Sequence, residues 1–190
     1  MGKKNCPRLI IKILLALVPV LWTFSGAQNL AVSTNLAGYA FLGTMNVEAS
    51  YALAQHWSVN AGMRYNPFTF GSEDSIVQAR QQAYALGARY WPWHIYSGWW
   101  VAGKMQYQEY NAGTSKTEYT AEGDRIGSGL AGGYTFMLNP HLNLEVGLGV
   151  WAGYDRFVRY ECPRCGRIVG EGSQFFLLPD DVLLMLSYVF

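Results

Sequence analysis

Charged residues and long apolar runs are both scarce in this sequence. Charged side chains make up 14% of the 190 residues, against roughly 25% in ordinary soluble domains. Beyond residue 27 no apolar run approaches the about 20 residues that a membrane-spanning helix needs. The formal net charge is +1, which gives no electrostatic reason to expect a nucleic acid as partner. We therefore expect a single domain without helical spans and without a nucleic-acid-binding function.

The first 27 residues have the organisation of a secretory signal peptide. Four basic residues and no acid lie within residues 1–12, residues 13–22 are apolar, and residues 25–27 are small. This order of segments is typical of a cleaved leader, although a retained N-terminal anchor is the alternative. We expect residues 1–27 to be removed, and residues 28–190 to form the mature domain.

The mature sequence alternates between apolar and polar residues almost from end to end. A period of two places the two sets of side chains on opposite faces of extended strands. Eight such segments can be marked, at residues 30–36, 45–53, 57–65, 81–90, 99–108, 125–138, 142–155 and 182–190. Alternation alone does not distinguish a soluble sandwich from a barrel.

The connections and the aromatic residues favour the barrel. Links at residues 54–56, 91–97 and 139–141 are short, whereas those at 66–78, 111–123 and 156–179 are long and polar. Aromatic residues of the apolar face gather at both ends of the segments, with Tyr65, Tyr84, Tyr107 and Tyr154 at one end and Trp57, Tyr90, Trp99, Phe136, Tyr188 and Phe190 at the other. Short turns on one side, long loops on the other and two aromatic girdles are typical of outer-membrane barrels. The sequence therefore predicts an all-β, eight-stranded, antiparallel, up-and-down transmembrane β-barrel with three long outer loops.

The end of the chain adds a family resemblance. Leu184, Leu186, Tyr188 and Phe190 look like the signal read by the barrel assembly machinery of the bacterial outer membrane. The mature chain resembles small barrels of the OmpA-barrel or OmpX type. More narrowly, residues 29–31, 89–91, 132–134 and 179–190 are similar to an uncharacterised family, a domain of unknown function sometimes found near fimbrial assembly genes. The resemblance implies outer-membrane lipid as surroundings and a surface protein or fimbrial component as candidate partner, and it brings no catalytic motif.

Six charged residues fall on the predicted inner face, each on a different strand. They are Glu48, Arg64, Arg89, Lys104, Arg125 and Glu145. An eight-stranded barrel is just wide enough for side chains to fill it, so these residues are expected to pair into a network that plugs the lumen. A path for protons or small solutes is the alternative, because charge within a membrane is often functional.

Cysteine is rare, and two of the three cysteines stand close together. Cys162 and Cys165 have the spacing of half a zinc ribbon, but a structural zinc needs four ligands. In an exported protein, a short disulfide that stiffens the third long loop is the favoured interpretation. A zinc ion shared between two chains, a redox-active pair and free thiols remain open.

Enzyme activity is not expected from this sequence. Eight-stranded outer-membrane lipid A deacylases and palmitoyl transferases place a catalytic histidine, with serine or an acid, near the outer leaflet. Here His56, His94 and His141 all fall in the predicted short turns, on the opposite side. The sequence predicts a non-enzymatic barrel without cofactor or metal, in a structural or surface-interaction role that could be linked to appendage assembly. A narrow channel is the alternative function.

Overall fold

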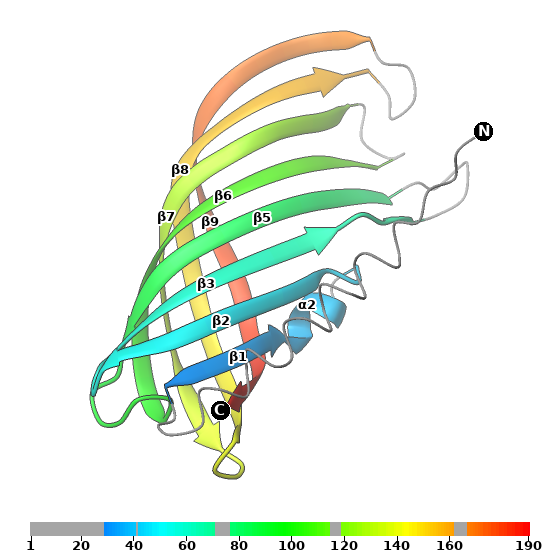
Figure 1. Ribbon diagram of the computed structural model, residues 1–190. Helices are drawn as coiled ribbons and strands as arrows, with labels where there is room; N and C mark the ends of the chain where they lie inside the picture. The colour runs from blue at the N-terminus through cyan, green and yellow to red at the C-terminus, as the bar shows by residue number, and fades with distance from the viewer. Residues whose placement is uncertain (1–28, 41, 71–76, 115–118, 162–166) are drawn as a thin grey trace, which may run out of the picture.

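The computed structural model describes residues 29–40, 42–70, 77–114, 119–161 and 167–190. Nearly all of them lie in nine β-strands of one antiparallel sheet, which curves around on itself (Figure 1). No helix within these residues is both long and apolar enough to cross a membrane. The predicted signal peptide, and Cys162 with Cys165, lie outside the described residues.

The strands differ greatly in length. Their bounds are β1 Leu30–Asn35, β2 Met45–Ala54, β3 Trp57–Asn66, β4 Thr69–Phe70, β5 Val77–Tyr90, β6 Gly98–Thr114, β7 Thr120–Met137, β8 Leu142–Tyr160 and β9 Ile168–Val189. A five-residue helix, α2 (Leu36–Ala40), follows β1.

Hydrogen bonding closes the sheet into a ring of eight strands. Strands β5, β6, β7, β8 and β9 pair in that order. Strand β1 pairs with both β9 and β2, and β2 pairs with β3. The ring closes where β3 pairs with β5, with Trp57 opposite Tyr90 and Asn66 opposite Gln81. The short β4 pairs only with the far end of β5 and stands outside the ring. The predicted all-β antiparallel fold and its eight principal strands are confirmed.

The long polar loops predicted from the sequence are largely strand, which corrects that expectation. Strand β6 continues to Thr114 and β7 begins at Thr120, so most of residues 111–123 is paired. In the same way, β8 runs to Tyr160 and β9 begins at Ile168, within the predicted loop of residues 156–179. These strand extensions were not predicted because their sequence is polar and rich in glycine. Backbone pairing between neighbouring strands does not require an apolar face. One side of the ring is therefore much taller than the side formed by β1 to β3 (Figure 1).

The connection between β1 and β2 lies between the first two predicted strand segments. It contains α2, and the chain then reverses at Leu42 and Gly43, whose φ angles of 54° and 67° are left-handed. The side chain of Asn46 holds this reversal, because its Nδ2 donates to the carbonyl of Asn35 at 2.9 Å.

The two faces of the ring differ as the alternation predicts. Outward side chains are mainly apolar and exposed, including Leu86, Leu130 and Leu148 at 66%, 69% and 66% exposure. Inward side chains are mainly polar and buried, including Ser33, Asn60 and Thr135. The apolar surface of this fold therefore lies on its outside, the reverse of a soluble domain.

Candidate functional site: the interior of the ring

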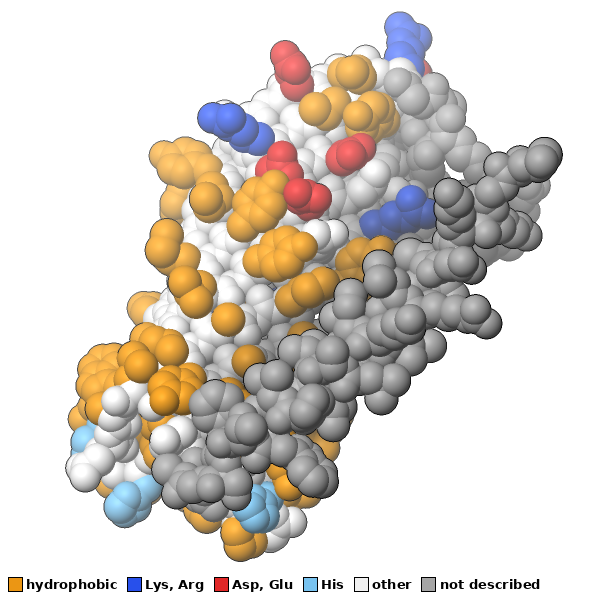
Figure 2. Space-filling view, in the orientation of Figure 1, with side chains coloured by type: hydrophobic (Ala, Val, Ile, Leu, Met, Phe, Trp, Pro, Cys, Tyr) orange, Lys and Arg blue, Asp and Glu red, His pale blue; other side chains and the backbone are white. Residues whose placement is uncertain are grey.

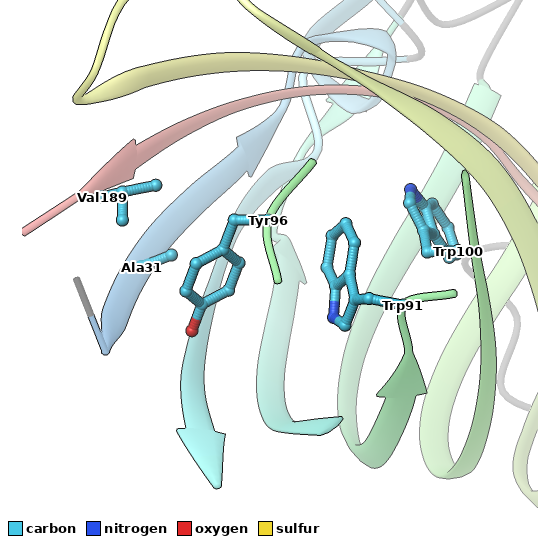
Figure 3. Packing of buried hydrophobic residues seen from close by; sticks show 5 residues of the cluster. All are labelled: Ala31, Trp91, Tyr96, Trp100 and Val189. Atoms are coloured by element: carbon cyan, nitrogen blue, oxygen red, sulfur yellow. The ribbon is translucent and has the colours of Figure 1, made fainter. Parts of the chain in front are cut away.

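An aromatic plug closes the end of the ring that carries the short turns. It consists of Trp91, Tyr96 and Trp100, which are buried together with Ala31 and Val189 (Figure 3). The rings of Trp91 and Tyr96 meet edge to face with centroids 5.7 Å apart, and those of Trp91 and Trp100 lie 6.4 Å apart. The sequence reading treated residues 91–97 as a plain turn. The link instead folds inward and seals the interior.

Hydrogen bonds fix the plug to the surrounding strands. The Tyr96 hydroxyl lies 3.1 Å from the carbonyl oxygens of both Asn29 and Ser50. Trp91 Nε1 donates to Ser58 Oγ at 3.0 Å. The backbone of Tyr96 has a φ of 60°, a conformation that non-glycine residues adopt rarely and that here turns the ring inward. Burial raises the pKa of the Tyr96 phenol above its ordinary value near 10.

The first charged cluster, which we call the Arg89 triad, lies directly against the plug. Arg89 forms ion pairs with Glu48 on β2 and with Glu145 on β8, the latter at 2.6 Å. Its guanidinium carbon also lies 4.6 Å from the centre of the Trp100 ring. Ser187 Oγ, on β9, donates to Glu145 Oε1 at 2.5 Å and so gives this acid a further partner from a fourth strand. The triad ties opposite walls of the ring together and carries a formal charge of −1.

The second cluster, the Asp180 trio, joins β3, β6 and β9. Asp180 on β9 receives Arg64 from β3 at 3.2 Å and Lys104 from β6. Its side chain is 1% exposed. Arg64 Nη2 also donates to Gln106 Oε1 at 3.3 Å. Two cations from different strands share this one carboxylate.

The third cluster lies further from the plug, where β6, β7 and β8 continue beyond the shorter strands. Arg125 Nε lies 3.2 Å from Asp155 Oδ2, and the Tyr110 hydroxyl donates to the same carboxylate at 2.9 Å. The guanidinium carbon of Arg125 lies 3.8 Å from the centre of the Tyr110 ring. This cluster is electrically neutral.

The structure distributes the six charged residues predicted from the sequence among these three clusters. Glu48, Arg89 and Glu145 come together, whereas Arg64 and Lys104 meet on Asp180, and Arg125 pairs with Asp155. Neither aspartate belonged to the predicted network. The signal that could have found them is charge balance: the predicted set holds four cations and two acids, and a narrow interior requires two more acids.

Asp180 was not predicted to face the interior, and the reason is geometric. The register between β8 and β9 shifts between Leu148 and Val150, where Leu148 pairs with Val182 and Val150 with Pro179. Such an irregularity changes which side chains face inward. Strict alternation counted back from Val182 would place Asp180 on the outer face, whereas the shift brings it inside.

A cavity of about 380 Å³ lies inside the ring, bounded by the Arg89 triad, the Asp180 trio and the polar residues of β5 and β6. Gln81, Gln106, Gln108 and Tyr110 line it, together with Arg125 nearer the tall end. Apolar side chains, including Leu183 and Met185, share the lining, and Trp100 borders the cavity on the plug side.

The histidines lie near the short turns, at the end of the molecule opposite the tall strands (Figure 2). His56 Nδ1 contacts the carbonyl of Trp91 at 2.8 Å, and His141 Nδ1 contacts that of Val189 at 2.9 Å. Both side chains thus bind backbone groups of the turns. Within the described residues, no group of three or more His, Cys, Asp or Glu side chains could hold a metal ion.

The fold and the interior define a class of protein: a closed ring of eight antiparallel strands with an apolar outside, a charged interior and one sealed end. The family DUF3575, proteins of unknown function, matches residues 12–190. The chain therefore belongs to that family. No curated protein and no solved structure matches the chain.

Proposed function

We propose that this protein is a non-enzymatic β-barrel of the bacterial outer membrane, of the size of the OmpA-barrel and OmpX type. Its interior is plugged, and its taller end serves a structural or surface-interaction role. The observation that carries the proposal is the exposed apolar outer face of a closed ring.

The outer face is too apolar for water. Leu86, Met105, Leu130, Leu148 and Leu177, on five successive ring strands, are each 66% to 69% exposed. Soluble monomers rarely expose a continuous apolar patch larger than a few hundred Å². A lipid bilayer covers such a belt without any further partner.

Aromatic side chains bound this belt on both sides. Cross-strand pairing aligns Tyr84, Tyr107, Ile126, Tyr154 and Phe175 in one continuous row. Trp57 and Tyr90, with ring centroids 5.1 Å apart, and Trp99 and Tyr134, at 5.2 Å, begin the other row. From Trp99 to Tyr107 the strand advances about 26 Å at roughly 3.3 Å per residue. With the strand tilt of about 35–45° that outer-membrane barrels have, this length corresponds to a height of about 19–22 Å, close to the apolar band of about 25 Å.

Gel migration of the outer-membrane fraction, with and without boiling, tests the proposal. Closed barrels resist unfolding by detergent, so the unboiled protein should migrate differently from the boiled protein. The absence of a shift, together with recovery of the protein as a soluble periplasmic species, would overturn the proposal.

Electrical recording distinguishes the plugged barrel from the alternative function, a narrow channel. The aromatic plug and the paired charges support a non-conducting interior, so purified protein in a planar bilayer should show no ion conductance. Steady single-channel steps would favour the channel, and substitutions such as Lys104→Gln and Arg64→Gln should then change their size.

A surface-interaction role assigns the tall end to the outside of the cell. Arg167, whose side chain is 77% exposed, stands at that end, and Trp93, 60% exposed, lies in a turn at the other end. A photo-crosslinking residue at position 167 should capture a surface protein or fimbrial component on intact cells, whereas one at position 93 should not. Replacing Cys162 and Cys165 with serine should weaken that contact and leave the gel shift intact. Equal labelling from both positions would contradict the assignment.

A further inference from the structure

We infer that one border of the tall wall binds an extended segment of a partner polypeptide by strand addition. This border is formed by residues 170–178 of β9, which we call the β9 edge. The inference rests on the proposed surface-interaction role, because it names the means by which the tall end contacts a partner.

Strand β9 is paired along its full length on one side only. On the β8 side, residues 170–178 face residues 151–159 in unbroken register. On the other side, the pairing with β1 ends at Met185, opposite Asn35. Among the described residues, β8 and β1 are the only strands that pair with β9. The part of β9 drawn in orange in Figure 1 therefore forms the border of the tall wall.

The side chain of Asn35 shows which backbone groups of β9 face the open side. Its Nδ2 donates to the carbonyl of Val182 at 3.3 Å, and its Oδ1 accepts from the N–H of Leu184 at 3.1 Å. Val182 and Leu184 both face outward and are exposed. In an extended strand, residues that share a face direct their N–H and C=O groups to the same side. The outward residues of the β9 edge therefore direct theirs to the open side, and these residues are Glu171, Ser173, Phe175 and Leu177.

The β9 edge lacks the residues that usually prevent strand addition. Lysine and proline are common protection on edge strands, whereas residues 170–178 include neither and have Glu171 as their one charged residue. The edge is about 30 Å long at roughly 3.3 Å per residue. A methyl group on Gly170 would meet nothing within 4 Å, so this end of the edge is uncovered. A long, regular, open edge of this kind is a template for another strand.

Strand direction argues against a second copy of the chain as the occupant. Two copies that stand upright in one membrane are related by an axis along the membrane normal. Their β9 strands then cross at twice the strand tilt, about 70–90° for a tilt of about 35–45°, and cannot pair along their length. An extended segment of another polypeptide has no such restriction and can align antiparallel to β9.

The outward side chains of the edge define the chemistry of this segment. Phe175 and Leu177 are exposed and apolar, whereas Glu171 has no ion pair with any described residue. Cross-strand neighbours on one face contact each other directly. The partner segment therefore carries a basic residue opposite Glu171 and apolar residues at the alternate positions beside Phe175 and Leu177.

A fluorescent peptide with the sequence of residues 151–159 is the probe, because this sequence already pairs with residues 170–178 on the β8 side. Fluorescence anisotropy with the full chain in non-ionic detergent should give a Kd between about 1 μM and 1 mM. N-methyl groups on the peptide amides of Tyr154 and Arg156, which would face the edge, should weaken binding about tenfold. N-methyl groups on the amides of Asp155 and Phe157, which would face away, are the matched control and should not.

Two further changes test the edge and its charge. Ser173→Pro removes one N–H from the open side of β9 and should weaken binding about fivefold, whereas Ser173→Ala keeps that N–H and should bind as the natural protein does. Val158→Lys in the peptide places an ammonium opposite Glu171 and should tighten binding several-fold. If Ser173→Pro fails to fold, the two methylated peptides still decide.

The inference is overturned if no binding is found at about 1 mM peptide, or if both methylated peptides bind equally. A disulfide-linked dimer of Ser173→Cys on intact cells, absent from the natural protein, would assign the edge to a second copy and would overturn the choice of partner. The gel shift upon boiling, measured in parallel, separates the two proposals. A shift without peptide binding contradicts strand addition alone, whereas the absence of a shift contradicts the barrel.

Discussion

Arg89 on β5 and Glu145 on β8 face each other across the ring, with Arg89 Nη1 2.6 Å from Glu145 Oε2. Both side chains are almost fully enclosed, at 5% and 4% exposure. Glu48 on β2 binds the same guanidinium. One cation therefore connects three strands that are not neighbours in the ring, and it does so immediately above the aromatic plug.

Removal of this cation should destabilise the protein strongly. In Arg89→Met, Glu48 and Glu145 lose their shared partner, and breaking a buried ion pair from one side typically costs about 3–5 kcal/mol. The free energy of unfolding, measured by urea titration in non-ionic detergent, should fall by that amount. Arg167→Gln removes an exposed cation and should change it by less than about 0.5 kcal/mol.

A triple variant provides the control for this prediction. Adding Glu48→Gln and Glu145→Gln to Arg89→Met removes the unpaired charges and should recover part of the lost stability, because uncompensated charge causes most of the penalty. Recovery of nothing would mean that Arg89 acts mainly through its contact with Trp100.

Two glycines make room for the plug, and each should resist substitution. A methyl group on Gly133 would clash first with the carbonyl oxygen of Val146 and would lie 2.7 Å from Trp100 Cζ2. One on Gly147 would lie 2.8 Å from the carbonyl oxygen of Gly132 and 3.1 Å from Trp100 Cζ2. Trp100 itself is 1% exposed. Gly133→Ala should therefore lower the free energy of unfolding by about 1–3 kcal/mol. Gly170→Ala is the matched control, since nothing lies within 4 Å of its added methyl group, and an equal loss there would contradict the explanation.

The sequence predicts those parts of this structure that depend on strict alternation. Strands such as β3, where Val59 faces outward and Asn60 inward, can be predicted from the sequence because the period of two persists over the whole strand. Asp180 was not, because the register shift beside it is set by pairing with β8. Tyr96 was not either, because its inward direction depends on a left-handed backbone angle and on carbonyl partners in distant strands. The sequence predicts which charged residues face inward. It does not predict which of them pair, because the partners come from strands that meet only in the closed ring.

We expect the free energy of unfolding to fall at alkaline pH because of the buried Tyr96 hydroxyl. Burial raises the pKa of this phenol in the folded state, so the unfolded chain loses its proton first, near pH 10. Above that pH the unfolded state binds fewer protons than the folded state, and stability falls until the folded pKa is passed. Urea titrations between pH 8 and 11.5, a range chosen around about pH 10, should show this fall.

Tyr96→Phe isolates the contribution of this one tyrosine. The variant should be less stable by about 1–2 kcal/mol at neutral pH, since the carbonyls of Asn29 and Ser50 lose a donor. It should also lose less stability than the natural protein as the pH rises past 10, because the buried phenol is gone. Identical pH profiles for the two proteins would contradict a buried, protonated Tyr96.

Two adjacent tryptophans should report separately on lipid and on the interior. Trp99 is 57% exposed on the outer face, where it packs edge to face on Tyr134, whereas Trp100 is 1% exposed in the plug. In vesicles that contain brominated lipids, Trp99→Phe should reduce the fraction of fluorescence that the bromine quenches, because tryptophans at the membrane interface contact acyl chains. Trp100→Phe should leave that fraction unchanged or raise it slightly, and it should lower the free energy of unfolding where Trp99→Phe does not. If both substitutions affected quenching equally, the outer face would not be the face in contact with lipid.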